Sequence, residues 1–173
     1  MRYASIRSMD ISNGDGIGAS LFVQGCHRHC DGCFNKETWD FNGGKEWTEK
    51  TQEDFLNIID KPYIKRISIL GGEPLDDENV EGVLNLIEKI REKFGNDKKI
   101  WLYTGYTWSQ IMYDIPAIRI RKDILRKCDI VVDGEFKKEY KDLSLKYRGS
   151  SNQRVIDVNK SIYYRGIVLY NTD

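Results

Sequence analysis

The amino-acid sequence predicts an α/β fold, because short runs of β-branched and aromatic residues alternate with longer segments of helical periodicity. Such alternation is typical of a mostly parallel sheet whose strands are joined by helical crossovers. The 173 residues are too few for a complete eight-unit (β/α) barrel, which needs about 250. No internal repeat or linker divides the sequence. We therefore expect a single domain over residues 1–173, either an incomplete (β/α) barrel or an open α/β sheet, and we favour the incomplete barrel.

The expected strands are short apolar runs that end at turn residues. They lie at residues 3–9, 19–23, 66–70, 100–103 and 129–133, with two further candidates in the tail at 154–158 and 161–169. The clearest helix spans residues 77–94, because its apolar residues recur at helical spacing and Gly95 stops it. Another is expected at 48–60. A third begins at Thr107, which has capping-box spacing to Gln110; Pro116 breaks it, and residues 118–127 resume it.

Charge and hydropathy exclude several classes of function. The 27 basic and 27 acidic residues cancel, so no net field attracts nucleic acid or anionic lipid. No apolar run approaches the roughly 18–20 residues that a membrane-spanning helix needs. The first seven residues lack the apolar core of a secretory signal, so we expect a cytoplasmic protein.

Three of the four cysteines lie close together, directly after the strand expected at 19–23. Cys26, Cys30 and Cys33 are spaced by four and then three positions. In a reducing compartment such a group indicates metal binding or redox chemistry before it indicates disulfides. Three thiolates at this spacing can hold one face of a cuboidal iron–sulfur cluster. Ordinary four-iron clusters take four cysteines, so a triplet leaves one iron open for chemistry.

Two other metal arrangements stay open at this point. His27 or His29 could complete a zinc site with the three cysteines, although each lies too near a cysteine in sequence to be well placed for it. Cys128 could be a fourth cluster ligand. It precedes an apolar strand, however, where a small buried side chain is the commoner explanation, and we interpret it as structural.

Four further segments have both an ordinary and a functional interpretation. Residues 71–75, Gly-Gly-Glu-Pro-Leu, form a strand-to-helix turn whose glycines allow close approach of a ligand. Residues 103–106, Tyr-Thr-Gly-Tyr, either pack on a helix or face a cofactor. Asp133 and Glu135 could bind a ribose hydroxyl or orient a partner peptide, but acids at loop starts are common. Residues 147–154 make a polar turn before a strand.

Together these motifs resemble a known family. Cys26, Cys30 and Cys33 resemble the C-x3-C-x2-C signature of the radical S-adenosylmethionine superfamily, and residues 71–74 resemble its Gly-Gly-Glu-Pro motif. Many members carry an aromatic residue just before the third cysteine. Here Gly32 has that position and Phe34 follows the cysteine, which is similar to the glycyl-radical activase branch.

The resemblance extends over nearly the whole chain in order. With residues 10–14, 103–106, 133–136 and 147–154 included, the pattern is similar to that of the activases of anaerobic ribonucleoside-triphosphate reductases. The short chain also fits, because other glycyl-radical activases are usually longer.

The resemblance implies an oxidoreductase with a [4Fe-4S] cluster whose ligands are Cys26, Cys30 and Cys33. The open iron would chelate S-adenosylmethionine, and one electron would cleave its sulfonium to methionine and a 5′-deoxyadenosyl radical. No catalytic side chain beyond the cluster is implied. The implied cofactor contacts are Gly32, Cys33, Phe34, Gly71, Gly72 and Glu73.

The implied target is a backbone glycine of the large subunit of the anaerobic ribonucleoside-triphosphate reductase. A truncated barrel suits this target, because the side left open would admit a protein loop. The chain shows no flavin or nicotinamide motif, so an external flavodoxin- or ferredoxin-type donor is implied. The alternatives are a radical S-adenosylmethionine enzyme acting on a small molecule or on another glycyl-radical enzyme, and a non-catalytic zinc-binding module.

Overall fold

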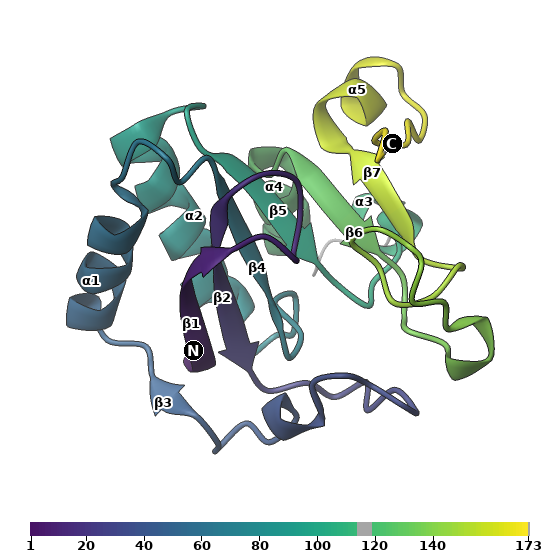
Figure 1. Ribbon diagram of the computed structural model, residues 1–173, viewed down its shortest axis with the longest axis horizontal. Coiled ribbons are helices and arrows are strands. Elements are labelled where there is room, and N and C mark those ends of the chain that lie inside the picture. Colours follow the sequence, from purple (N-terminus) through teal and green to yellow (C-terminus); the bar gives the residue numbers. More distant parts are fainter. Residues whose placement is uncertain (114–118, 173) are drawn as a thin grey trace.

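A computed structural model describes residues 1–113 and 119–172 and contains one seven-stranded sheet (Figure 1). The strands follow the order β3-β1-β2-β4-β5-β6-β7 across the sheet. Their bounds are β1 Arg2–Asp10, β2 Gly18–Gln24, β3 Lys45–Glu46, β4 Arg66–Gly71, β5 Lys99–Tyr103, β6 Ile130–Asp133 and β7 Arg154–Asp157.

The sheet is mixed and open. Its central strands β2, β4, β5 and β6 pair in parallel, as the alternating pattern predicts. The outer pairs β1–β2, β1–β3 and β6–β7 are antiparallel. The expectation of a mostly parallel sheet is therefore met only in the centre, and the incomplete barrel is not confirmed. β1 and β2 are antiparallel because they join through a short glycine-rich loop, and short connections favour antiparallel neighbours.

Helices pack on one face of this sheet. Their bounds are α1 Glu49–Ile59, α2 Val80–Phe94, α3 Trp108–Tyr113, α4 Arg119–Lys127 and α5 Val158–Tyr163. Side chains alternate between the two faces of a strand, so Leu21, Ile69, Leu102 and Val131 share the helix-side core with residues such as Phe55 and Leu86. In the described part of the chain, no helix combines the length and apolar character needed to cross a membrane.

Local capping signals decide where several helices begin. Thr48 caps α1 by accepting a hydrogen bond from the Thr51 amide. The expected capping box before α3 is present: the Gln110 side chain accepts from the Thr107 amide, and the Thr107 hydroxyl accepts from the Gln110 amide. The predicted break at Pro116 lies outside the described residues.

The tail differs from the prediction. Residues 161–169 were expected to form a strand, but α5 begins at Val158 and covers the first part of this run. Asp157 caps the helix by accepting a hydrogen bond from the Lys160 amide at 2.9 Å. Among the described residues, one isolated β-bridge, between Ile156 and Leu169, joins the segment after α5 to β7. Ile162, Tyr163 and Tyr164 are residue types common in strands, but the aspartate cap favours a helix here.

The face opposite the helices carries a smaller cluster. Trp101, Ile130, Val132 and Val155 are buried there, and Tyr103, Tyr147 and Tyr170 pack against them. The loop between β1 and β2 closes one end of this face around Arg66, whose guanidinium donates to the carbonyls of Asp10 and Asn13, each at 2.6 Å. In Figure 1 the loop after β2 runs along the lower edge of the sheet, towards the segment that follows β6.

Candidate metal centre

A pocket of about 550 Å³ opens at the carboxyl ends of the central parallel strands, on the face opposite the helices. This is the edge at which open α/β sheets place their ligands. The three clustered cysteines line the pocket together with the ends of β4, β5 and β6 and with part of the 142–153 segment. Its lining includes Cys26, Cys30, Cys33, Phe34, Leu70, Gly71, Gly72, Glu73, Tyr103, Thr104, Val132, Phe136, Tyr147, Arg148 and Gln153.

The cysteine loop leaves β2 in a defined conformation. Gly25 has a φ of 100°, and a Cβ at this position would lie 2.2 Å from the Phe41 ring, so only glycine fits. The Gly25 and Cys26 amides donate to the carbonyls of Thr38 and Trp39 at 2.7 and 3.1 Å. The loop is thus held at both ends before any metal binds.

The three thiols are the residues that could hold a cluster. The Asn35 amide donates to the Cys33 sulfur at 3.4 Å, a type of contact that tunes cluster ligands. The Cys30 thiol lies 3.5 Å from Oε1 of Glu135. Burial, followed by the Glu135 carboxylate, raises the pKa of Cys30 to about 12. Metal binding must therefore displace the Cys30 proton, as it does at thiolate sites in general.

A mononuclear zinc site fits the structure less well. Among the described residues, no three or more histidine, cysteine, aspartate or glutamate side chains are grouped to hold a single metal ion. The His27 ring hydrogen-bonds to Asp76 at 2.9 Å, and the His29 ring stacks on Trp39 at 4.5 Å. A cuboidal cluster spreads its thiolates over several irons and does not need them to converge on one atom.

No disulfide forms among the cysteines, all four of which lie in the described part of the chain. Cys128 is 1% exposed and belongs to the helix-side core, whereas the other three cysteines line the pocket. Its thiol donates to the Ile124 carbonyl at 3.3 Å, and burial raises its pKa. This location fits the structural role expected for Cys128.

The Gly71–Gly72 pair packs against the start of the cysteine loop. A Cβ on Gly71 would lie 2.7 Å from backbone atoms of Val23, and one on Gly72 would lie 2.3 Å from the Gly25 carbonyl oxygen. The Gly72 and Glu73 amides donate to the carbonyls of Val23 and Gly25 at 2.9 and 2.8 Å. The glycines thus let β4 and the cysteine loop approach each other at backbone distance.

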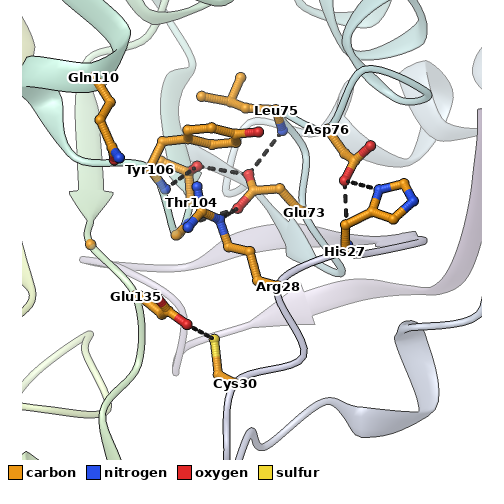
Figure 2. Close-up of polar contacts among 12 residues, drawn as sticks. His27, Arg28, Cys30, Glu73, Leu75, Asp76, Thr104, Tyr106, Gln110 and Glu135 are labelled. Atoms are coloured by element: carbon orange, nitrogen blue, oxygen red, sulfur yellow. Dashed lines mark hydrogen bonds and ion pairs between the residues drawn. The ribbon is translucent and has the colours of Figure 1, made fainter.

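Glu73 is buried, and its carboxylate accepts hydrogen bonds on both oxygens (Figure 2). Oε1 accepts from the Thr104 hydroxyl at 2.7 Å and from the Leu75 amide at 2.9 Å. Oε2 accepts from the Gly105 amide at 2.7 Å and lies 3.3 Å from Nε of Arg28. Burial raises the pKa of Glu73, and these donors act to lower it. Glu73 therefore joins the end of β5 to the cysteine loop.

Arg28 completes this connection, a role that the sequence pattern did not predict. Its guanidinium lies 4.0 Å from the centre of the Tyr106 ring, and that of Arg121 in α4 lies 4.3 Å from the same ring. A Cβ on Gly105 would lie 2.3 Å from the Arg28 side chain, which explains the glycine in Tyr-Thr-Gly-Tyr. The cation–π contacts at Tyr106 and the Arg28–Glu73 ion pair thus help to fix the position of the cysteine loop. An arginine between two candidate ligands was the one signal available in the sequence.

Gly32 and Phe34 lie where the cysteine loop meets the 134–149 segment. The Phe34 ring is 5.2 Å from that of Phe136, and it remains 53% exposed while lining the pocket. A Cβ on Gly32 would lie 3.4 Å from the Lys138 side chain. Of the expected cofactor contacts, Cys33, Phe34, Gly71, Gly72 and Glu73 line the pocket, whereas Gly32 is not among its lining residues. The contacts themselves stay a prediction.

Asp133 ends β6 and Glu135 follows it, and of these two acids Asp133 has its partners within the chain. Asp133 accepts from the Trp108 amide at 2.7 Å and pairs with Arg154, so it joins α3 to β7. Glu135 instead faces Cys30. The polar segment before β7 folds around Gln153, whose Oε1 accepts from the Gly149 amide at 3.0 Å and whose Nε2 donates to the Gly134 carbonyl at 2.9 Å.

Comparisons with known proteins identify the family. A model of the 4Fe-4S single cluster domain family matches residues 12–156. The anaerobic ribonucleoside-triphosphate reductase-activating protein of Escherichia coli K12 is 38% identical over 157 residues, which cover 90% of this chain and 97% of that protein. The chain belongs to the anaerobic ribonucleoside-triphosphate reductase-activating protein family.

Other relatives with the same name agree with this assignment. The Pasteurella multocida protein is 35% identical over 155 residues, covering 88% of this chain and 95% of its own length. The protein of phage T4 is 34% identical over 155 residues, covering 90% and 93%. The family match therefore assigns a 4Fe-4S cluster domain to residues 12–156, which include all three pocket cysteines.

Proposed function

We propose that this protein binds a [4Fe-4S] cluster through Cys26, Cys30 and Cys33, cleaves S-adenosylmethionine reductively at the open iron, and generates a glycyl radical on the anaerobic ribonucleoside-triphosphate reductase. One observation carries the proposal. Three thiols, and no fourth cysteine, line a pocket at the carboxyl edge of the parallel strands in a chain of this family. The fourth iron of a cluster held there is left for a ligand from outside the chain.

A cluster bound by these thiols supplies the electron that splits the sulfonium into methionine and a 5′-deoxyadenosyl radical. The chain's own residues bind, orient and shield. Arg28 and Glu73 hold the cysteine loop against the strand ends, so the thiols keep their relative positions. Phe34 and Phe136 form an apolar wall at the pocket, and Leu70 and Val132 line its floor. Once a bound partner covers it, such an apolar lining would keep water away from a radical.

The proposed macromolecular partners are the large subunit of the reductase and an external electron donor. Activation requires a target glycine to reach the cleaved cofactor, so a polypeptide segment of the reductase would have to enter the pocket, whose lining includes Leu143 and Leu145. The donor is proposed to be of the flavodoxin or ferredoxin type, because the sequence carries no motif for a flavin or nicotinamide of its own.

Electron paramagnetic resonance tests the proposal directly. The protein is reconstituted anaerobically with iron and sulfide, reduced with dithionite, and mixed with S-adenosylmethionine and the anaerobic reductase of the same organism. We expect methionine and 5′-deoxyadenosine to form and a glycyl doublet to appear on the reductase. A Cys33→Ala variant should give neither.

Two results would contradict parts of the proposal. Cofactor cleavage without a glycyl doublet would mean that the radical has another target. A colourless protein that holds one zinc ion and cleaves no cofactor would reject radical chemistry altogether and favour the zinc-binding alternative.

A further inference from the structure

Tyr103 carries a buried polar atom that the rest of the chain leaves without a partner. It is the last residue of β5, and its side chain lies on the sheet face opposite the helices, where it lines the pocket. Its hydroxyl oxygen is shielded from solvent, yet it has no hydrogen-bond partner among the described residues. Buried polar groups in native proteins are nearly always paired, so this hydroxyl indicates a missing partner.

Two other buried polar side chains near the pocket, Thr104 and Arg66, have several hydrogen-bond partners each. Thr104, the next residue, donates to Glu73 at 2.7 Å and accepts from the Tyr106 amide at 3.1 Å. The deeply buried Arg66 is surrounded by the backbone carbonyls of the loop between β1 and β2. Two other buried polar atoms of the described residues also lack a hydrogen-bond partner, Oγ of Ser20 and Nε of Arg28. Ser20 does not line the pocket, and Nε of Arg28 lies 3.3 Å from the Glu73 carboxylate, so Tyr103 differs from both.

The surroundings of Tyr103 define the chemistry of the missing group. Trp101, Val132 and Tyr147 belong to the same apolar cluster, and Trp101 contacts the Tyr147 ring edge-on at 5.2 Å. Burial raises the pKa of Tyr103, so its hydroxyl stays protonated and can donate. Since the protonated hydroxyl has one hydrogen to donate, an acceptor that enters with the occupant of the pocket would satisfy it.

A polypeptide segment brings such acceptors with it. Each inserted residue carries a backbone carbonyl that loses its water and needs a donor within the pocket. Gly71 and Tyr103 are each the last residue of their strand, and Tyr103 follows Leu102, which pairs with Ile69. The Tyr103 side chain therefore lies on the second face of the sheet at the level of Leu70, just before the loops that hold the cysteines and Gly72–Glu73.

We propose that Tyr103 is a positioning residue whose hydroxyl donates a hydrogen bond to a backbone carbonyl of the partner's glycine-bearing segment. This inference rests on the proposed function, because it requires a protein substrate to enter the pocket. The hydrogen bond holds the segment at a fixed depth, which a reaction between one carbon radical and one glycine demands.

Tyr103→Phe tests this role, because it removes the hydroxyl and keeps the ring. Tyr63→Phe is the matched control, since Tyr63 is 45% exposed and lies outside the pocket lining. Three quantities are measured on the reconstituted protein: the reductase concentration giving half-maximal glycyl radical, the dissociation constant for S-adenosylmethionine by equilibrium dialysis, and the urea midpoint of unfolding without partner or cofactor.

We expect Tyr103→Phe to raise the half-maximal reductase concentration about 2- to 12-fold, the range for loss of one hydrogen bond. Cofactor affinity should equal that of the wild type. The urea midpoint should be equal or higher, because an unpartnered hydroxyl no longer has to be buried. Tyr63→Phe should change none of the three quantities.

Three results would each overturn the inference. An unchanged half-maximal concentration would mean that the hydroxyl does not contact the partner. Weaker cofactor binding would assign the hydroxyl to S-adenosylmethionine instead. A lower urea midpoint would show that the hydroxyl is already paired, through water or within the chain. All three differ from failure of the proposed function, in which the wild type itself would form no glycyl radical.

Discussion

Replacing Glu73 with glutamine tests whether this carboxylate holds the candidate site together. Its oxygens face four donors: the Thr104 hydroxyl, the Leu75 and Gly105 amides, and the Arg28 guanidinium. Glutamine keeps the shape but turns one oxygen into an amide donor. Whichever way it is oriented, it faces two of these donors with an N–H group. A buried donor left unpaired costs about 1–3 kcal/mol. With partial relaxation, we expect Glu73→Gln to lower the free energy of unfolding by about 3 kcal/mol.

Urea unfolding of the reduced, metal-free protein, followed by circular dichroism, measures this loss. With a slope of about 2 kcal/mol per molar urea, the midpoint should fall by about 1.5 M. Glu78→Gln is the matched control, because Glu78 is exposed five residues along the same segment and should shift the midpoint by less than about 0.25 M. A similarly small shift in Glu73→Gln would refute the reasoning. It would mean that Glu73 is protonated in the folded protein, as its raised pKa allows, and that an ionised acceptor is not needed.

Three further predictions concern the cysteines, the glycine pair and acid stability. Cys30→Ala should lose most bound iron after anaerobic reconstitution, whereas Cys128→Ala should keep the wild-type iron and sulfide content; equal losses would contradict the structural role of Cys128. Gly72→Ala places a Cβ 2.3 Å from the Gly25 carbonyl oxygen, so it should cost about 1–3 kcal/mol in urea unfolding. Burial acts to raise the pKa of Asp10, but hydrogen bonds from the following loop and a nearby guanidinium lower it below its ordinary value. Its contribution to stability is therefore present above about pH 4 and is lost as the pH falls through the lowered pKa. Asp10→Asn should destabilise the metal-free protein at pH 7, and the difference from the wild type should shrink between pH 4 and pH 2; a difference independent of pH would contradict this sign.

The central strands could be predicted because burial and periodicity act locally. The run at 66–70 is buried along β4, and the helical spacing in 77–94 matches the buried face of α2. The start of α2 was placed three residues too early, because residues 77–79 belong to the turn that holds Asn79 against Glu73 and Gly25. The two-residue strand β3 was missed, since it pairs with β1 over a distance of more than forty residues. Short edges of this kind depend on tertiary contacts that periodicity does not contain.

The tail helix shows a different limit. Residues 158–163 make less than two turns, too few for helical periodicity to distinguish them from an aromatic strand. The cap at Asp157 is local and could have been recognised. The Ser161 hydroxyl, however, accepts from the Val168 amide at 2.9 Å, and this contact fixes how the chain returns to β7. The strand at 161–169 was predicted from residue type, whereas the Asp157 cap and the Ser161–Val168 hydrogen bond favour the helix.

The glycines of the Gly-Gly-Glu-Pro segment show why a site is harder to predict than a motif. The sequence indicates that a neighbour approaches Gly71 and Gly72 closely, and it does not say which neighbour. In the structure this neighbour is the backbone of Val23 and Gly25, at the point where β2 becomes the cysteine loop. Glu73 then extends the same junction to residues 31 and 45 positions away in sequence. These contacts fix where the cysteine loop leaves the sheet. Cluster binding by the three thiols depends on this placement first, so a cofactor contact at Gly72 or Glu73 would add to a structural role that both residues already have.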